Sequence, residues 1–483
     1  METPTRADAS FFFLLLGPLC FLFTLFSDAP TNMPDIAWKT TGLALWMGIW
    51  WVSEAVPIPV TSLLPLIVFP IAGIAQMDEA SKSYAHPLIF LFLGGFLLSI
   101  AMEKWSLHQR IALHVMVKSG HRPDAQILAM MSVSAFLSMW INNTATTLMM
   151  LPIALSVIHV LEKKGVNVEN YGKALLLGIA YSASIGGVAT IIGTAPNALM
   201  VAFLADSYQI KISFAQWMIM GVPFASLMVL IGWWWLTRYA FKLEGHSDSC
   251  FQTTVFKKQL SELGTMQFAE KQVLLVFLFA AISWVSRPLF VKWTGLNITD
   301  TGIAMIAALM LFTLPAQRDF SQRVLYWRDT QSVPWGILLL FGGGLALAAQ
   351  IKQSGLAHYV AMSLTSLDVL PIILGIVIVT ALITFLTELT SNTATAAGFL
   401  PLLAPVAMEL TGSPLVWVIP AAMAASCAFM MPVATPPNAI VFGSDRISIR
   451  DMVRAGFAMN LFAITIISLL TVVIASFVFG FNV

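Results

Sequence analysis

The feature that most constrains this chain is a polar motif that occurs twice, each time inside a long hydrophobic segment. NNTATTLMMLP covers residues 142–152, and SNTATAAGFLP covers residues 391–401. Hydrocarbon cannot satisfy the Asn, Ser and Thr side chains. Interrupted helical backbone at membrane depth is tolerated only where it is buried in protein or lines a wet cavity. We therefore expect both motifs to face a polar cavity inside the protein.

The composition is that of a polytopic membrane protein. Of the 483 residues, 58% are hydrophobic and only 10% are charged, with a mean hydropathy of +0.84, whereas soluble domains carry about 25% charged residues. A net charge of +1 gives no reason to expect nucleic-acid binding. Cys20, Cys250 and Cys427 lie far apart and indicate neither a disulfide framework nor a zinc site.

Apolar runs of about 17 to 25 residues predict eleven transmembrane helices. The run at 11–26 lacks a small-residue cleavage site at its end, so we interpret it as a retained first helix. The predicted spans are 10–27, 37–53, 57–75, 86–103, 172–205, 216–238, 270–291, 300–316, 334–350, 414–443 and 455–481. Two further regions, 125–161 and 371–408, carry the motifs near their middles and are interpreted as re-entrant hairpins.

The distribution of basic residues supports this topology with the N-terminus inside and the C-terminus outside. The inner segments hold 19 of the 25 Lys and Arg residues: Arg6, Lys104, Arg110, Lys118, Arg122, Lys163, Lys164, Lys173, Arg238, Lys242, Lys257, Lys258, Lys271, Arg318, Arg323, Arg328, Arg446, Arg450 and Arg454. The outer segments hold Lys39, Lys82, Lys211, Arg287, Lys292 and Lys352.

The two motifs belong to an internal repeat. Asn143 and Asn392 are 249 positions apart, and Leu151-Pro152 and Gly94-Gly95 find their matches at the same offset. GTAPNAL (193–199) matches ATPPNAI (434–440) at a slightly shorter offset. We expect a first transmembrane helix in 1–36, repeat 1 in 37–240, a cytoplasmic linker in 241–269 and repeat 2 in 270–483.

The two copies are expected to face opposite ways across the membrane. Residues 103–124, before the first motif, hold four Lys and Arg residues, whereas residues 351–370, before the second, hold one. The first hairpin should therefore enter from the cytoplasm and the second from outside. An inverted repeat with paired interruptions is typical of a transporter with its binding site at the membrane midplane. One isolated Asn-Thr pair would more simply join helices together.

Each interruption offers groups that can bind an anion and groups that can bind a cation. Free N–H groups at helix N-termini suit an anion, while freed carbonyls and Asn, Ser and Thr oxygens suit a hard cation such as Na⁺. Pro196, Pro436 and Pro437 remove backbone donors and disfavour helix in the residue before each of them. The second interruptions, 193–197 and 434–438, are therefore expected to unwind as well.

The chain resembles the divalent anion:sodium symporter family, which includes dicarboxylate and citrate carriers of the INDY type. The resemblance rests on SNTAT (391–395), NNTAT (142–146), WWVSEAVPIPVTSLLP (50–65) and ASCAFMMPVATPPNAIV (425–441). It covers nearly the whole chain. It implies two Na⁺ sites, one in each repeat, flanking a substrate between the hairpin tips. It also implies a homodimer and an elevator-type movement.

The resemblance further implies which residues bind each ion. The first Na⁺ site would use Ser138, Asn143 and Gly193, and the second would use Thr387, Thr390, Asn392 and Ala434. The substrate would contact Asn143, Thr144 and Thr194 on one side and, on the other, Ser391, Asn392, Thr393, Thr435 and Pro436. Asn142 would be a ninth substrate contact. It stands where the family usually has Ser, so it would alter substrate size preference or replace a Na⁺ ligand.

Three other ionisable residues in the apolar regions invite interpretation. Glu388 lies one turn before Asn392, but its repeat equivalent is Met139. It would serve in hydrogen bonding near the hairpin, or in cation attraction or proton coupling. Glu54 would be a cap or an interfacial partner, and His86 an interfacial residue.

The expected function is Na⁺-coupled symport of a four-carbon dicarboxylate such as succinate, fumarate or malate across the cytoplasmic membrane. Two similar tips suit a ligand with two similar ends, whereas sulfate is a single compact centre and citrate carries a third carboxylate. Sulfate or citrate transport and dicarboxylate exchange remain alternatives. An enzyme is not expected, since the sequence has no HExxH, GxSxG or phosphate-loop motif.

Overall fold

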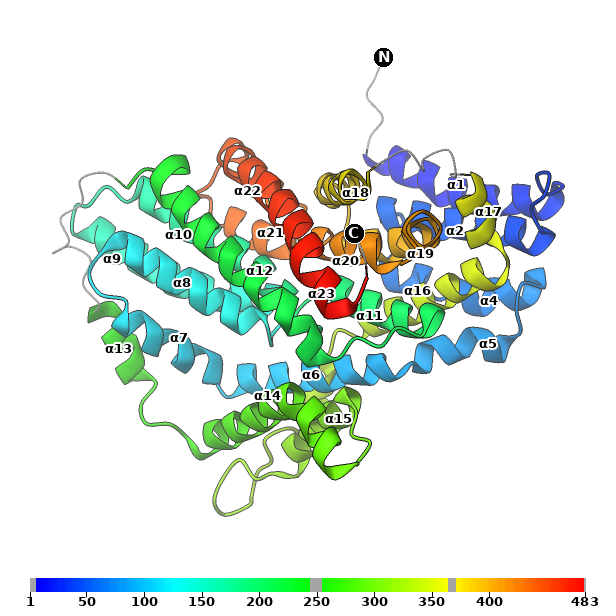
Figure 1. Cartoon of the computed structure of the whole chain (residues 1–483). Helices are drawn as coiled ribbons and strands as arrows, with labels where there is room; N and C mark the ends of the chain where they lie inside the picture. Colours follow the sequence, from blue (N-terminus) through cyan, green and yellow to red (C-terminus); the bar gives the residue numbers. More distant parts are fainter. Residues whose placement is uncertain (1–5, 244–253, 364–370, 482–483) are drawn as a thin grey trace.

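The computed structural model describes residues 6–243, 254–363 and 371–481, and the regular structure in these ranges is helical apart from one isolated bridge between Pro315 and Arg323. The first half contains α1 (Arg6–Phe26), α2 (Asp35–Ser53), α3 (Ile58–Thr61), α4 (Leu64–Ala72), α5 (Met77–Lys82), α6 (Pro87–Lys104), α7 (Leu107–Lys118), α8 (Pro123–Ser138), α9 (Asn143–Lys163), α10 (Glu169–Val188), α11 (Ala195–Tyr208) and α12 (Phe214–Trp235). Figure 1 shows their arrangement.

The second half is also helical. It contains α13 (Thr254–Glu262), α14 (Phe268–Thr294), α15 (Asp300–Thr313), α16 (Trp335–Gln353), α17 (Leu356–Ser363), α18 (Ile372–Thr387), α19 (Asn392–Thr411), α20 (Leu415–Ala424), α21 (Pro436–Phe442), α22 (Ile449–Leu470) and α23 (Ser476–Phe479). One π-helical turn follows α12 at Leu236–Ala240, and another follows α22 at Thr471–Ala475.

The helix boundaries repeat between the two halves. Shifting α8 by 249 positions gives the bounds of α18, and the same shift carries the first residue of α7 to that of α17 and of α9 to that of α19. The first residues of α11 and α21 are 241 positions apart. The bounds of α22 and its π-turn lie 235 positions after those of α12 and its π-turn. The repeat in the sequence is thus also a repeat of helix lengths and interruptions.

The structure breaks three of the expected spans. The span at 172–205 is divided into α10 and α11, the span at 414–443 into α20 and α21, and the span at 57–75 into α3 and α4. Proline explains each break, because Pro65, Pro196 and Pro436 stand at the start of the second helix, where a missing N–H costs no intrahelical bond. Short helices that the sequence analysis did not anticipate, among them α5, α7, α13 and α17, connect the longer ones.

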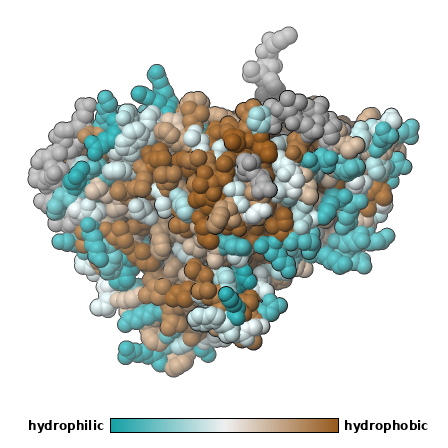
Figure 2. All heavy atoms as spheres, viewed as in Figure 1, coloured by the Kyte–Doolittle hydropathy of each residue, from teal (hydrophilic) through white to brown (hydrophobic). Residues whose placement is uncertain are grey.

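The molecular surface is that of a membrane protein. Within the described residues, seven helical segments are long and apolar enough to span a bilayer: Met77–Lys104, Asn143–Lys163, Phe214–Ala240, Phe268–Thr294, Trp335–Gln353, Asn392–Thr411 and Ile449–Phe479. Five shorter apolar helices accompany them. Figure 2 shows hydrophobic residues over the middle of one face and hydrophilic residues toward its left and right margins.

The interior brings the two halves together. Helix α10, which is buried along most of its length, contacts α8, α9 and α12 of its own half and α21 of the other. Helix α22 in turn contacts α12, α18 and α20. The hairpins α8–α9 and α18–α19 are therefore held in one helical body that contains parts of both repeats.

Candidate functional site

The site begins at the tips of the two hairpins, where the helices stop at the motifs. Helix α8 ends at Ser138 and α9 begins at Asn143, while α18 ends at Thr387 and α19 begins at Asn392. At the first tip Asn142 is in the extended N-cap conformation and its Oδ1 accepts a hydrogen bond from the Ala145 N–H at 2.8 Å. Ser391 has the same backbone conformation but its side chain caps no N–H of α19.

The two motif asparagines have matching partners. Ser138 Oγ donates to Asn143 Oδ1 at 2.6 Å, and Thr387 Oγ1 donates to Asn392 Oδ1 at 2.7 Å. Each hydroxyl lies on the last residue of one hairpin arm and each amide on the first residue of the other. These contacts close both tips and concentrate oxygen atoms at corresponding positions in the two repeats.

The unwound segments after α10 and α20 complete the site. In each segment, the side chain of an asparagine donates hydrogen bonds to backbone carbonyls. Asn197 Nδ2 donates to the carbonyls of Val188 and Thr190 at 3.0 and 2.8 Å. Asn438 Nδ2 donates to the carbonyls of Ala428 and Met431 at 3.3 and 3.0 Å. Both asparagines are fully buried. They satisfy backbone carbonyls that the broken helices leave without partners.

The first hairpin is joined to its unwound segment through Thr190 and a close glycine contact. Thr190 Oγ1 donates to the Met139 carbonyl and accepts from the Gly193 N–H at 3.0 Å. A Cβ on Gly187 would lie 2.6 Å from Asn143 Oδ1 and 3.0 Å from the Gly193 carbonyl. The amide oxygen and that carbonyl therefore flank a space that only glycine leaves open.

The second hairpin uses Glu388 for the corresponding junction. Its carboxylate accepts the backbone N–H groups of Phe429, Met430 and Met431 at 2.6 to 3.1 Å. Asn460 Nδ2 of α22 donates to the same carboxylate at 2.8 Å. The side chain is buried and does not line the cavity. Of the roles considered for Glu388, these contacts favour hydrogen bonding that holds the hairpin to the unwound segment.

Both tips open into one cavity of about 670 Å³. All nine expected substrate-contacting residues line it: Asn142, Asn143, Thr144, Thr194, Ser391, Asn392, Thr393, Thr435 and Pro436. Of the expected Na⁺ ligands, Gly193, Thr390 and Ala434 line it together with the two asparagines. Ser138 and Thr387 lie buried behind those asparagines. The structure therefore brings the expected residues of both repeats to one place.

The cavity also has neighbours that the sequence analysis missed. Val52 and Ser53 at the end of α2, and Ile337 in α16, also line it. Thr194 Oγ1 lies 3.2 Å from Ser426 Oγ and so links the two unwound segments. Packing between distant helices sets these contacts. Val52, Ser53 and Ser426 lie within the motifs at 50–65 and 425–441, whereas Ile337 lies outside every motif.

Glu54 is a helix cap, one of the two roles expected for it, and it also reaches the cavity. It follows α2 as its C-cap residue with a φ of 50°, and its exposed side chain lines the cavity. It is therefore both a cap and a cavity residue. His86 caps α6, with its Nδ1 accepting the Leu88 N–H at 3.3 Å.

The lining has an unusual charge composition for a site that would hold an anion. Among the described residues that surround the cavity there is no Lys, Arg or His, and Glu54 is the ionisable side chain present. Neutral donors remain: the N-terminal N–H groups of α9 and α19, three side-chain amides and several hydroxyls. Such donors bind an anion most effectively when a cation is bound nearby. A polar cavity between paired interrupted helices is the arrangement of a secondary transporter.

Comparison with known proteins agrees with this class. A family profile described as the sodium:sulfate symporter transmembrane region matches residues 9–480. The chain belongs to this family of divalent anion:sodium symporters, and it is a membrane transporter and not an enzyme.

Its relatives include proteins named sodium-dependent dicarboxylate transporter SdcS. The protein of Staphylococcus saprophyticus is 40% identical over 97% of this chain and 92% of its own, and that of Staphylococcus aureus strain MRSA252 is 41% identical with the same coverage.

Two solved transporters share the fold at low identity. The YdaH transporter of Alcanivorax borkumensis has a TM-score of 0.56 and 14% identity over 98% of both chains. The MtrF protein of Neisseria gonorrhoeae has a TM-score of 0.57 and 11% identity over 97% of this chain and 94% of its own.

Proposed function

We propose that this protein imports four-carbon dicarboxylates such as succinate, fumarate and malate by symport with Na⁺. The observation that carries the proposal is the single cavity at which the two near-identical tips meet without any cationic side chain among the described lining residues. A dianion placed there needs positive charge from elsewhere, and Na⁺ supplies it. Relatives at about 40% identity that are named sodium-dependent dicarboxylate transporters support the same substrate pair.

Two Na⁺ sites follow from the oxygen groups at the tips. The first would consist of Ser138 Oγ, Asn143 Oδ1 and the Gly193 carbonyl. The second would consist of Thr387 Oγ1, Asn392 Oδ1, Thr390 and the Ala434 carbonyl. Hydroxyl, amide and carbonyl oxygens are suitable ligands for a hard cation. When a cation binds, each hydroxyl hydrogen turns away, and both oxygens of the pair then face the ion.

The substrate would lie between the two sites. An asparagine whose oxygen binds Na⁺ presents its amide N–H₂ to a carboxylate, which couples the two binding events. One carboxylate would contact Asn143, Thr144 and Thr194. The other would contact a set from the second repeat: Ser391, Asn392, Thr393, Thr435 and Pro436. A ligand with two similar ends fits this pseudo-symmetric arrangement better than sulfate or citrate.

The transport cycle we propose is an elevator movement within a homodimer. The hairpins with α10–α12 and α20–α22 would form the moving body, and α2 and α16 would belong to the scaffold. The cavity supports this division, because residues of both groups line it. The repeat boundaries 37–240 and 270–483, the re-entrant hairpins, eleven spans, an inside N-terminus and an outside C-terminus belong to the same proposal.

Purified protein in liposomes with an imposed Na⁺ gradient tests the function. Labelled succinate should accumulate in the Na⁺ gradient, with a sigmoidal dependence on Na⁺, and should not accumulate when choline replaces Na⁺. Unlabelled fumarate and malate should compete more strongly than citrate or sulfate. Equal uptake in choline would refute the coupling. Strong inhibition by sulfate with none by the four-carbon diacids would refute the substrate and favour sulfate transport.

Loading the liposomes separates symport from exchange. Symport predicts uptake into empty liposomes, whereas obligatory exchange requires internal dicarboxylate. Uptake that appears only with internal succinate would replace symport with dicarboxylate exchange.

A further inference from the structure

The end of α12 carries a basic and aromatic pocket that the transport cavity does not include. The residues Trp233, Trp234, Arg238, Tyr239 and Lys242 line an open cavity of about 590 Å³. The pocket lies where the spanning segment Phe214–Ala240 ends, so it sits at a boundary between hydrocarbon and water. Tryptophan and tyrosine are enriched at that level of a bilayer.

The π-helical turn at Leu236–Ala240 shapes the pocket. The Phe241 N–H bonds to the Leu236 carbonyl at 3.0 Å, five residues back. This wider turn brings Trp234 and Tyr239 together, with ring centroids 4.6 Å apart, and stacks Trp235 on Tyr239 at 5.8 Å. Indole hydrogen bonds from Trp233 to the Asp124 carbonyl at 2.8 Å and from Trp235 to the Ala455 carbonyl at 3.1 Å fix the helix end. These bonds anchor the helix end that carries the aromatic residues.

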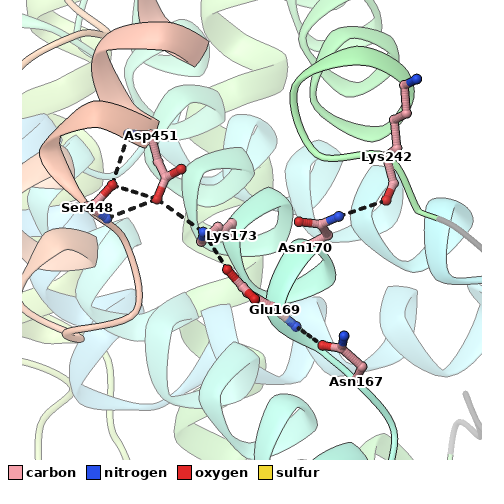
Figure 3. A network of polar contacts seen from close by, with 7 residues as sticks. All are labelled: Asn167, Glu169, Asn170, Lys173, Lys242, Ser448 and Asp451. Atoms are coloured by element: carbon pink, nitrogen blue, oxygen red, sulfur yellow. Dashed lines mark hydrogen bonds and ion pairs between the residues drawn. The ribbon is translucent and has the colours of Figure 1, made fainter.

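The pocket has an excess of positive charge. Among the described residues, Asp124 is the carboxylate that pairs with the pocket, and it binds Arg122 at 2.7 Å and Arg238 at 3.6 Å. Lys242 forms no ion pair within the described part of the chain. Its backbone carbonyl accepts from Asn170 Nδ2 at 3.0 Å, while its ammonium extends away from that network (Figure 3). Within the described residues, the pocket and its edge therefore hold three cations, Arg122, Arg238 and Lys242, and one carboxylate, that of Asp124.

An exposed apolar stripe leads along α12 to the same pocket. Leu227, Leu230 and Trp234 follow one another at helical spacing, with exposed fractions of 39%, 51% and 44%. A ligand that satisfies both features has an anionic head for Arg238 and Lys242 and a hydrocarbon tail for the stripe. Acyl chains along α12 with a phosphodiester at its end meet that requirement.

We propose that the pocket at the end of α12 binds the headgroup of an anionic phospholipid, with its acyl chains packed along Leu227 and Leu230. Guanidinium and ammonium groups donate to the phosphodiester oxygens. The exposed ring of Trp234 covers the glycerol region. This site is separate from the transport cavity, so the proposal does not depend on which anion the protein carries.

Native mass spectrometry of the purified full-length protein tests the site. Phosphatidylglycerol should bind more tightly than phosphatidylcholine with the same acyl chains. Arg238→Gln with Lys242→Gln should lower phosphatidylglycerol affinity by roughly 10- to 30-fold, toward that of phosphatidylcholine. Lys257→Gln with Lys258→Gln, an equal loss of charge on exposed residues of α13, is the matched control and should leave that affinity unchanged.

A charge-retaining pair, Arg238→Lys with Lys242→Arg, should keep phosphatidylglycerol binding and guards against a folding defect in the neutral variant. Inorganic phosphate at millimolar concentration should not displace the lipid, because it lacks acyl chains. Equal binding of the two lipids, retained affinity in the neutral variant, or displacement by inorganic phosphate would each overturn the proposal.

Discussion

At the residue scale, Asn143 and Asn392 occupy the same structural position in two repeats. Each begins a helix, and each amide oxygen accepts from a hydroxyl on the residue that ends the preceding helix. Asn142 and Ser391 precede them but make different contacts, because the Asn142 side chain caps α9 by accepting a hydrogen bond from the Ala145 N–H. Its amide oxygen is thereby engaged in a local hydrogen bond. This contact favours the expectation of altered substrate preference over that of a replaced Na⁺ ligand.

Replacing either motif asparagine by alanine is expected to abolish transport. Asn143→Ala and Asn392→Ala each remove an amide oxygen that we assign to Na⁺ and an amide N–H₂ that we assign to substrate. Uptake in proteoliposomes should fall to the background of empty liposomes, while the protein stays folded by size-exclusion chromatography. Asn297→Ala, at an exposed loop position, is the control. Near-normal rate and Na⁺ affinity in either tip variant would show that the site is wrongly assigned.

Glu388 is expected to matter for stability and not for proton coupling. Glu388→Ala leaves three backbone N–H groups and the Asn460 amide without their acceptor. A buried donor without a partner costs about 1–3 kcal/mol, so the thermal unfolding temperature in detergent should fall clearly. The exposed Glu409→Ala on α19 should leave it unchanged. Succinate uptake by the wild type driven by a proton gradient without Na⁺, and lost in Glu388→Gln, would contradict this role.

At the element scale, the two repeats use different hydrogen bonds to join the hairpin to the unwound segment. The position of Met139 in the first hairpin corresponds to that of Glu388 in the second. The Met139 carbonyl accepts from Thr190, whereas Glu388 uses its side chain to bind three backbone N–H groups. The neighbouring position differs too. Trp140 is buried in a stack with Phe214 and Trp284, whereas its counterpart Leu389 is exposed and lines the cavity.

Gly187 in α10 is expected to be intolerant of a methyl group. In Gly187→Ala the new Cβ would lie 2.6 Å from Asn143 Oδ1, so the amide must move. We expect a several-fold rise in the Na⁺ concentration needed for half-maximal uptake. Gly172→Ala in the same helix is a matched control, since its Cβ would meet Ile158 at an ordinary 3.5 Å. Both changes raise helix propensity by about 1 kcal/mol, so any difference between them reports the collision. Identical Na⁺ dependence in the two variants would count against the first site.

At the scale of the whole molecule, helices from both halves hold the candidate site together. Thr194 meets Ser426 across the two unwound segments, and Asn460 of α22 reaches Glu388 of the second hairpin. At the periphery, Arg110 of α7 forms a bidentate pair with Glu270 of α14 and also binds the carbonyls of Leu263 and Gly264. The hydrogen bonds to these two carbonyls hold the segment between α13 and α14 against α7.

Cysteine labelling tests the orientation of the molecule. In a variant without Cys20, Cys250 and Cys427, Lys292→Cys should react with a membrane-impermeant maleimide in intact cells, because residue 292 is expected outside. Lys258→Cys should react only after permeabilisation. The basic residues would then lie mostly on the cytoplasmic side, as the positive-inside rule requires. Labelling in the reverse order would invert the proposed topology.

The sequence alone determined the class of protein, the repeat and most of the residues that meet in the cavity. Long apolar runs identify membrane helices, and hydrocarbon makes each polar interruption costly unless it lines a cavity. The tertiary structure decided what depends on packing between distant segments. It placed Glu54 and Ile337 at the cavity, left an open space at Gly187 and satisfied the buried Glu388 with four N–H donors. Local sequence patterns, such as a proline within an apolar run, indicate which backbone groups lose their intrahelical hydrogen bonds. Only the assembled helices determine which partners satisfy them, because those partners lie many residues away in the chain.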